Sequence, residues 1–393
     1  MIAAEWSEVE LGDVIDLHDS KRKPLSGKER SARQGIYPYY GASGVIDHLD
    51  DYMLDGNYLL VSEDGENLNS RKLPIAFWAK GKFWVNNHAH IILGKEGKAN
   101  TDFIRLWLLQ ANISGYITGA AQPKLSQGNL CRIKLNIPEI ETQNKIASVL
   151  NNYDNLIENN NRRIAILADM AQSLYREWFV KFRFPGHENV KFKDSPLGQI
   201  PEGWEVKAAT DVIEFAPKMS LPKDDEKPFV AMPSISTSSM IIGDIEMRAG
   251  NSGTKFKNGD TLMARITPCL QNGKIGFVQF LDEENPIGFG STEFIVMRSK
   301  GLTPEFVYCL ARSDSFRGNA INSMAGADGR QRVKNDCFKS YYLAVPPKDI
   351  LDQFSVLSEA AFKEIFTLSK KNKNLKKQRD MLLPKLISGA ITV

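Results

Sequence analysis

The sequence is poor in the features that mark membrane, secreted and metal-binding proteins. Its four cysteines, Cys131, Cys269, Cys309 and Cys337, lie far apart and form no CxxC pair, so neither a zinc site nor a disulfide framework is indicated. No apolar run approaches the roughly 20 residues needed to cross a bilayer, and no basic and then apolar leader precedes the first polar segment. We therefore expect a cytoplasmic protein with reduced cysteines.

Motifs of the common enzyme classes are missing as well. The chain has no GxxxxGK[ST] phosphate loop, no GxGxxG turn after a strand and no HExxH helix. It also lacks the Asn-Pro-Pro-aromatic tetrad with which amino-methyltransferases hold a target base. The acidic segment SEDGE at residues 62–66 could bind a cation, but a solvated loop is the simpler interpretation. We expect no catalytic residue, no metal ligand and no cofactor in this chain.

Two weaker candidates for chemistry deserve a test against the structure. Glu202 and Glu205 lie close to Lys207 in the sequence, and this combination of carboxylates and a lysine weakly resembles a nuclease metal site. Short acidic and basic segments of this kind are, however, common. His88 and His90 would point to the same face of a strand, as two metal ligands might. Since no third ligand is suggested by the spacing, we interpret both histidines as polar groups with hydrogen-bond partners.

What the sequence does contain is a repeat with a period of about two hundred residues. Asp-Val-Ile begins seven residues after Trp6 and again seven residues after Trp204. Short β-rich stretches, Gly and Asn turns and a few short helices follow in each half, which predicts an α+β globule. Each half then closes with a Gly-Ala loop, a Gln, a Cys, an apolar strand ending in Pro and a Gln at the head of a helix.

A long periodic segment follows each globule. From Gln143 the apolar spacing alternates four and three residues, and a rougher version begins at Phe354, which is typical of a coiled-coil seam. A polar Asn near the middle of each seam costs stability but can fix register. We expect the two helices to pair antiparallel; packing of each helix on its own globule or on a separate protein is the alternative. The predicted seam residues are Ile146, Leu150, Tyr153, Ile157, Asn160, Ile164, Leu167, Leu174, Ile365, Leu368, Asn372, Leu375 and Leu382.

These patterns predict an α+β protein with a pseudo-twofold repeat. Two globular α+β domains are separated by two long helices that form an antiparallel coiled coil. The predicted divisions are a first domain at 1–140, a first helix at 141–182, a linker at 183–200, a second domain at 201–348 and a second helix at 349–393.

Polar clusters at equivalent points of both halves suit a DNA partner, although a net charge of +3 does not itself argue for one. Basic side chains can bind phosphates, while Arg, Gln and Ser can read base edges. A solvated loop or a hairpin tip would explain each cluster taken alone. The predicted DNA-binding residues are Lys21, Arg22, Lys23, Tyr39, Tyr40, Ser43, Gln122, Lys124 and Ser126 in the first half, and Arg265, Thr267, Gln271, Lys274, Arg330, Gln331 and Arg332 in the second.

The order of these motifs resembles that of the specificity subunits of Type I restriction-modification systems. DSPLGQIPEGWEV, GAAQPKLSQ, SLYREWFVKFRF, GDTLMARITPCLQNGKIGF and RDMLLPKLISGAI carry the likeness, which covers essentially the whole chain. The resemblance implies a non-catalytic subunit with two target-recognition domains, each reading one half of an asymmetric bipartite site in double-stranded DNA. It also implies that two methyltransferase subunits dock on the helices.

The resemblance assigns the chemistry to partner subunits. S-adenosylmethionine, ATP and magnesium are expected on two adenine methyltransferase subunits and two restriction and translocase subunits. One departure is the basic run KKNKNLKKQR from Lys370, with Arg379 on the seam itself, which fits partner docking, a solvated face or contact with DNA phosphates. A coiled-coil adaptor without DNA binding and a free-standing metal-dependent nuclease are the alternative functions.

Overall fold

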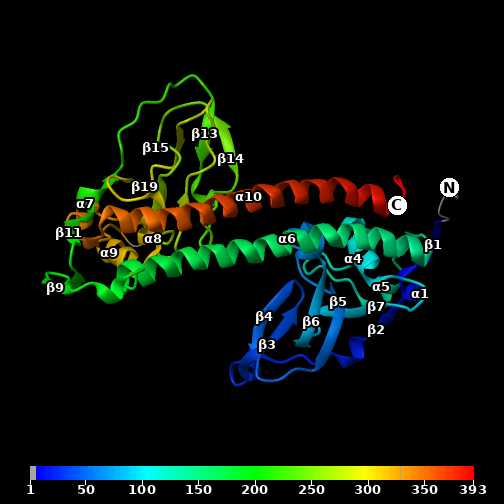
Figure 1. Cartoon of the computed structure of the whole chain (residues 1–393). Coiled ribbons are helices and arrows are strands. Elements are labelled where there is room, and N and C mark those ends of the chain that lie inside the picture. Colours follow the sequence, from blue (N-terminus) through cyan, green and yellow to red (C-terminus); the bar gives the residue numbers. More distant parts are fainter. Residues whose placement is uncertain (1–5, 328) are drawn as a thin grey trace. The chain divides into compact units, whose positions relative to one another are not determined.

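The computed structural model describes residues 6–327 and 329–393, which divide into two compact units (Figure 1). The first unit contains the chain up to Ile157 together with Asn374–Val393, and the second contains Glu158–Lys373. Each unit holds one globular α+β domain and one part of each long helix. Within the described residues, none of the helices combines the length and the apolarity needed to cross a membrane.

A six-stranded sheet forms the centre of the first domain. Leu59 and Val61 belong to one buried cluster and Leu60 to another, because successive side chains of a strand point to opposite faces. The sheet is therefore covered on both faces. All neighbouring strands are antiparallel except β3 and β6, which are parallel. The strand order is β2 (Ile15–Leu17), β7 (Ala89–Gly94), β5 (Leu54–Ser62), β6 (Ala76–Val85), β3 (Gln34–Gly41) and β4 (Gly44–Leu49).

Short helices and one two-stranded pair complete the first domain. Asn100 caps the longest of these helices, since its side chain accepts a hydrogen bond from the Phe103 N–H, and Phe103, Ile104 and Leu108 are buried beneath it. The remaining elements are β1 (Ser7–Glu10) paired with β8 (Lys134–Ile137), α1 (Leu11–Val14), η1 (Asp19–Lys21), α2 (Gly27–Ser31), α3 (Asn67–Ser70), α4 (Thr101–Gln110), η2 (Ser114–Tyr116) and α5 (Gln127–Cys131).

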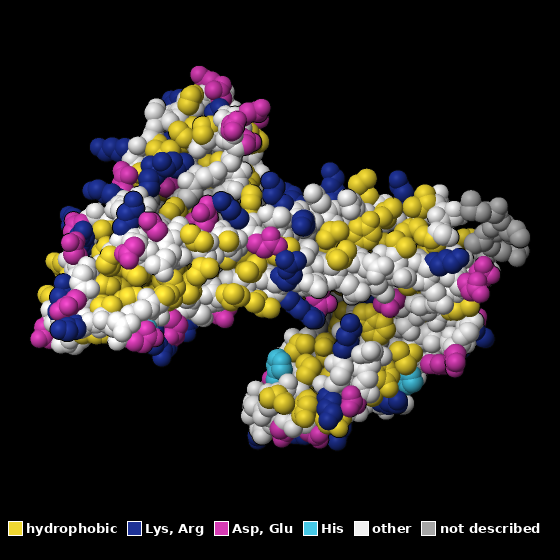
Figure 2. Space-filling model, viewed as in Figure 1, with side chains coloured by type: hydrophobic (Ala, Val, Ile, Leu, Met, Phe, Trp, Pro, Cys, Tyr) yellow, Lys and Arg dark blue, Asp and Glu magenta, His cyan; other side chains and the backbone are white. Residues whose placement is uncertain are grey.

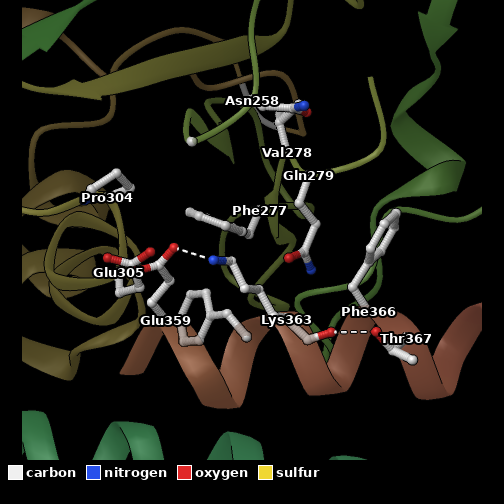
Figure 3. Close-up of a pocket in the computed structure, with 12 residues that line it drawn as sticks. Asn258, Phe277, Val278, Gln279, Pro304, Glu305, Glu359, Lys363, Phe366 and Thr367 are labelled. Atoms are coloured by element: carbon white, nitrogen blue, oxygen red, sulfur yellow. Dashed lines mark hydrogen bonds and ion pairs between the residues drawn. The ribbon is translucent and has the colours of Figure 1, made fainter. Parts of the chain in front are cut away.

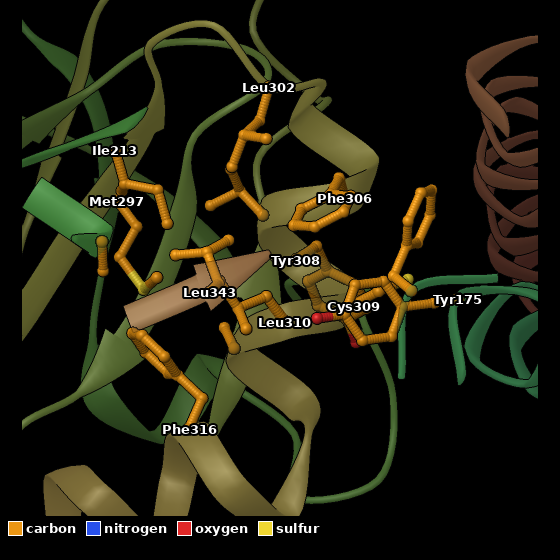
Figure 4. Close-up of a cluster of buried hydrophobic side chains, with 14 of the residues drawn as sticks. Tyr175, Ile213, Met297, Leu302, Phe306, Tyr308, Cys309, Leu310, Phe316 and Leu343 are labelled. Carbon is orange, nitrogen blue, oxygen red and sulfur yellow. The ribbon is translucent and has the colours of Figure 1, made fainter. Parts of the chain in front are cut away.

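The second domain repeats much of this plan and adds a second sheet. Aromatic and aliphatic side chains such as Phe306, Phe316 and Met297 fill its core, into which Tyr175 of the first long helix also packs (Figure 4). The first sheet has the order β12 (Ile213–Phe215), β19 (Phe294–Ser299), β16 (Thr261–Ala264) and β17 (Ile275–Phe277). The second has the order β14 (Ile245–Arg248), β13 (Lys227–Val230), β18 (Gly288–Gly290) and β15 (Thr254–Phe256).

The repeat is visible element by element. Ser7 of β1 lies opposite Ile137 of β8, and Glu205 lies opposite Val345 in the pair that follows the second Trp. The order β2, β7, β5, β6 corresponds to β12, β19, β16, β17, and all these neighbours are antiparallel in both domains. The other second-domain elements are β11 (Glu205–Ala208), α7 (Ala209–Val212), η5 (Met232–Ser234), α8 (Pro304–Arg312), α9 (Asp314–Asn322), η6 (Asn335–Phe338) and β20 (Tyr342–Val345).

The two long helices are α6 (Ile140–Tyr175), which continues into the π-helical turn η3 (Arg176–Val180), and α10 (Lys348–Ile387). In the first unit, Asp154 of α6 forms an ion pair with Arg379 of α10 at 2.6 Å. In the second unit, Arg163 of α6 pairs with Glu364 of α10 at 2.8 Å. Residues later in α6 pair with residues earlier in α10. The helices are therefore antiparallel in both units, as in a coiled coil.

The two seam asparagines meet. Nδ2 of Asn160 donates to Oδ1 of Asn372 at 2.8 Å, and Nδ2 of Asn372 donates to Oδ1 of Asn161 at 2.9 Å. Of the predicted seam residues, those that are buried are Ile146, Leu150, Ile157, Ile365, Leu368 and Asn372, and those that are half-buried are Tyr153, Asn160, Ile164, Leu167, Leu174, Leu375 and Leu382.

The segment between the first long helix and the second domain carries secondary structure of its own. It contains the turn η4 (His187–Asn189) and a hairpin of β9 (Phe192–Ser195) and β10 (Gly198–Pro201). Trp204 follows this hairpin and is 1% exposed, packed against the rings of Phe179, Phe182 and Phe184. The repeated Trp of the second half is thus a core residue.

Candidate nucleic-acid interface

In the first domain, the loop GAAQPKLSQ from Gly119 is joined to the acidic segment that follows β5. The Leu125 N–H donates to the Glu63 carbonyl at 2.7 Å, and the Gly65 N–H donates to the Pro123 carbonyl at 3.0 Å. We call residues 62–66 and 122–126, joined in this way, the first junction. It brings Gln122 and Lys124 to the end of the central strand.

In the second domain, the predicted segments ARITPCLQNGK and GRQRVK are joined in the same way. The Val333 N–H donates to the Arg265 carbonyl at 2.9 Å, and the Thr267 N–H donates to the Gln331 carbonyl at 3.0 Å. The Gln331 N–H in turn donates to the Thr267 hydroxyl at 3.1 Å. Residues 264–268 and 330–334 form the second junction, which follows β16 as the first follows β5. Two segments separated by more than fifty residues are therefore neighbours, as an interface would require. Residue 328, in the loop before Arg330, lies outside the described residues.

A buried network of charges lies behind the first junction. Arg22 pairs with Asp19 at 3.1 Å and with Glu63, and Lys124 reaches the other oxygen of Glu63 at 3.3 Å. Nδ1 of His90 lies 2.6 Å from Oδ2 of Asp19. Asp19 and Glu63 are each 9% exposed and His90 is fully buried. The interpretation of the acidic segment as a solvated loop is wrong for Glu63, because this residue is buried and paired with Arg22 and Lys124.

The same residues have the composition of a metal site. Ligand atoms of Asp19, Glu63 and His90 all lie within 4.8 Å of one another. The guanidinium of Arg22, however, bonds to both carboxylates, and Lys124 pairs with Glu63 as well, so these two cations already balance the two negative charges. His88 points elsewhere and pairs with Asp64 at 2.6 Å. Both histidines have hydrogen-bond partners, in line with their interpretation as structural polar groups.

In the second junction the charged side chains bond to groups around the two loops. Arg332 donates hydrogen bonds to Glu293 from two nitrogens, at 3.0 and 2.6 Å. Hydrogen bonding from this guanidinium lowers the pKa of the Glu293 carboxyl. Nη2 of Arg265 donates to the Val333 carbonyl at 3.4 Å, and Nζ of Lys274 donates to the Met232 carbonyl at 2.9 Å. The Arg265 contact joins the two loops of the junction, whereas Arg332 and Lys274 bond to residues outside these loops.

Several predicted DNA-binding residues have structural roles that occupy their polar atoms. Tyr39 is 1% exposed, and its hydroxyl accepts a hydrogen bond from the Leu25 N–H, so its ring cannot reach a base in this conformation. Tyr40 is half-buried against Phe77 and Phe83. The Ser126 hydroxyl caps α5. The predicted residues that hold the fold or the junctions are Arg22, Tyr39, Tyr40, Lys124, Ser126, Arg265, Thr267, Lys274 and Arg332.

Other predicted residues are exposed and have polar atoms available to a ligand. Lys21 and Lys23 are exposed, with their ammonium groups 5.7 Å from the Tyr58 ring centre and 5.9 Å from the Trp84 ring centre. Among the described residues, no hydrogen bond or ion pair is formed by the side chains of four exposed positions, two in each domain. These are Ser43, Gln122, Gln271 and Arg330.

Sequence reasoning missed the residues that support these loops. Asp19, Glu63 and Glu293 are separated from their partners by between 3 and 71 residues, and their types alone do not distinguish them from solvated acids. The available signal was the pair His88 and His90 in a strand otherwise rich in apolar residues.

The other candidates for chemistry do not form a catalytic site. Glu205 is an exposed residue of β11 and pairs with Lys207 at 2.7 Å, and this contact lowers the pKa of its carboxyl. A cavity of about 570 Å³ lies where the second domain meets α10, lined by Phe277, Phe362 and Glu305 among others (Figure 3). Since Phe277 pairs with Thr261, the cavity is at the opposite end of β16 from the second junction.

On the visible face of each unit, Lys and Arg side chains are interspersed with Asp and Glu, so charge of one sign does not dominate that face (Figure 2). Any DNA contact would therefore depend on individual loops and their side chains.

Comparison with known proteins finds similar chains of one kind. The family model described as the Type I restriction modification DNA specificity domain matches residues 3–168. The chain is 26% identical over 356 residues to the Type I restriction enzyme MjaIX specificity subunit of Methanocaldococcus jannaschii, covering 85% of this chain and 79% of that protein. The chain is therefore similar to Type I specificity subunits over most of its length.

Two further matches extend over nearly the full length of the chain. The MjaVIII specificity subunit of the same organism is 21% identical, with 100% of this chain and 94% of that protein covered. The crystal structure of the Type I restriction-modification S subunit from M. genitalium has the same fold, with a TM-score of 0.64 and 13% identity over 98% of this chain and 97% of that chain. The resemblance inferred from the motifs is confirmed.

Proposed function

We propose that this chain is the sequence-reading, non-catalytic subunit of a Type I restriction-modification complex. Each domain reads one half of an asymmetric bipartite site in double-stranded DNA through its junction. The repeated junction carries the proposal, because the same backbone arrangement presents Gln122 in one domain and Arg330 in the other. Gln can bond to adenine in two places and Arg to guanine, so the two halves would differ in sequence.

The helices supply the proposed docking surface for two methyltransferase subunits. Helices of a pair normally bury their apolar side chains, yet Ile166 and Met170 of α6 are each 59% exposed and lie one turn apart. Val356 of α10, in the same unit, is 70% exposed. In the first unit, Leu156 and Met381 are 53% and 57% exposed. Figure 2 shows hydrophobic side chains along the visible surface of the helices in both units.

Catalysis belongs to the partners in this proposal. Two methyltransferase subunits bind S-adenosylmethionine and methylate adenine, and two restriction and translocase subunits use ATP and magnesium. The complex works on DNA in the cytoplasm. The relatives support this division of labour, since each is named as the specificity subunit of a restriction enzyme.

Methylation mapping in a host that expresses this chain with its methyltransferase tests the proposal. We expect methylated adenine in one bipartite, asymmetric motif that disappears when this chain is omitted. A double variant, Ile166→Asp with Met170→Asp, should keep the fold, fail to co-purify with the methyltransferase and lose methylation. The matched control is Lys371→Asp, which also adds an acid to an exposed helix position. Methylation without this chain, or in a continuous motif, would contradict the proposal.

A further inference from the structure

Both nitrogens of the buried His90 ring face oxygen atoms. Nδ1 lies 2.6 Å from Oδ2 of Asp19, and Nε2 lies 2.8 Å from the carbonyl oxygen of Leu125. A carbonyl oxygen can only accept a hydrogen bond, so Nε2 must carry a proton. The state of the second nitrogen then depends on the carboxyl of Asp19.

Asp19 is held by two further contacts. Its Oδ1 accepts from the Ile91 N–H at 2.8 Å, and its Oδ2 lies 3.1 Å from Nη2 of Arg22. One proton lies between Oδ2 of Asp19 and Nδ1 of His90. His90 therefore joins Asp19 to the Leu125 carbonyl through a hydrogen bond at each ring nitrogen.

The charges around His90 come from each of the segments that meet at the first junction. Asp19 and Arg22 belong to the segment around η1, and Glu63 follows β5, with an oxygen 3.7 Å from Nδ1 of His90. Lys124 of the loop GAAQPKLSQ reaches His90 only through Glu63. Hydrogen bonds and ion pairs among these groups thus link the basic segment near Lys21 to the loop that presents Gln122.

We propose that His90, Asp19 and Glu63 are positioning residues that hold the first junction in its DNA-reading conformation through the proton on His90. None of the three would touch DNA. His90 holds the carbonyl of Leu125, next to Lys124 in the loop, and Glu63 holds both the backbone and the side chain of that loop. The inference rests on the proposed function, because it assigns a role within DNA recognition.

The second domain has no such device at the equivalent position. His90 lies opposite Val61 in the first sheet, and Ile295 lies opposite Met263 at the matching place of the second. Ile295 is 2% exposed, and its loops are joined by the Thr267 hydroxyl and by backbone bonds. Loss of the His90 hydrogen bonds should therefore affect reading by the first domain and leave reading by the second unchanged.

The first test is independent of DNA. The chain has five histidines, so selective ¹⁵N labelling of histidine in the full-length protein gives a spectrum simple enough to assign with His90→Gln. We expect Nε2 of His90 to be protonated, as its contact with the Leu125 carbonyl requires. An unprotonated Nε2 would overturn the proposal whether or not the protein binds DNA.

The second test measures discrimination between DNA half-sites in the complex with the methyltransferase. His90→Gln replaces a ring that bonds to both Asp19 and the Leu125 carbonyl with an amide that cannot make both hydrogen bonds in the same way. We expect it to lower discrimination about tenfold at the half-site that Gln122→Ala also relaxes, and not at the other half-site. His88→Gln is the matched control, because His88 is more exposed and bonds only to Asp64. Lys124→Met provides a second variant that leaves the buried core intact and should have the same selective effect.

The difference between the half-sites separates positioning from mere stabilisation, because general destabilisation would affect both. Equal loss of discrimination at both half-sites, or wild-type discrimination in His90→Gln, would overturn the inference while leaving the proposed function in place. Absence of bipartite specificity in the wild type would instead count against the proposed function.

Discussion

The two junctions share a backbone arrangement but not the chemistry behind it. In the first domain Glu63 is buried among Arg22, Lys124 and His90, whereas the equivalent residue of the second domain is Arg265, whose contact is a backbone carbonyl. The backbone bonds to the facing loop are nevertheless the same, at 2.7 Å in one domain and 2.9 Å in the other. Main-chain pairing therefore sets where the reading loop lies, and the side chains behind it are free to differ.

The second domain also buries a charged pair, but at the other end of its sheet. Asp260 is 1% exposed and accepts two hydrogen bonds from Arg298, at 2.8 and 2.6 Å. It precedes β16, while the second junction follows that strand. The first domain thus couples its buried charges to the proposed reading loop, and the second domain keeps them apart. The predictions below test this difference, beginning with the largest expected effect.

Asp260→Ala should cost the second unit about 3 kcal/mol of unfolding free energy, since it leaves the guanidinium of Arg298 without its buried partner. Denaturant unfolding followed by the fluorescence of Trp204 measures this loss. Protein that remains folded should keep its half-site preference, because the junction is elsewhere. Glu246→Ala is the control: it breaks the exposed pair with Arg248 and should cost less than about 1 kcal/mol. Altered sequence preference in Asp260→Ala would show that the charges and the junction are coupled after all.

Gln122→Ala and Arg330→Ala should each relax one half-site, by about 1 to 3 kcal/mol of discrimination per lost bidentate contact. The two variants are matched, because each residue lies two positions before the side chain that braces its loop, Lys124 or Arg332. Competition binding with duplexes altered in one half at a time gives the measurement.

Lys21→Ala is the control for these two variants. A residue that contacts only phosphate should weaken all sequences alike and reduce the salt slope by about 1. If Gln122→Ala and Arg330→Ala relaxed the same half-site, the assignment of one junction to each half would be wrong.

The sequence predicted the architecture better than it predicted the interface. The Trp repeat and the spacing of four and three residues reflect burial. Buried positions recur at regular intervals along the chain, so the sequence itself shows the pattern. The antiparallel helices and the two α+β domains follow from it. Tyr39 shows the limit: a tyrosine in a polar loop suggests base contact, yet its hydroxyl is taken by the Leu25 N–H. Contacts such as Asp19 with His90 join residues 71 positions apart and leave no local pattern.

One more pair of equivalent carboxyls distinguishes the domains. Asp102 and Glu305 are the second residues of α4 and α8, each directly before the buried Phe whose N–H bonds to the helix cap. Asp102 accepts a hydrogen bond from the Trp78 indole at 2.9 Å. Glu305 is 6% exposed, and one of its oxygens has no partner among the described residues. Burial raises the pKa of the Glu305 carboxyl above its usual value of 4.5, and the charge of nearby Glu359 adds to the rise.

Glu305→Gln should therefore stabilise the second unit, and more so as the pH rises. An acid with a raised pKa binds more protons in the folded than in the unfolded state, so its contribution to stability is greatest below the unfolded value and declines as the pH increases through the folded one. The glutamine variant carries no charge and escapes this loss. We expect its melting temperature to exceed that of the wild type by about 2 °C at pH 8 and by less at pH 5. Asp102→Asn should show no such gain, because its carboxylate is already bonded to Trp78. A gain in the Asp102 variant of equal size would mean that the difference lies in the helices as a whole and not in the burial of Glu305.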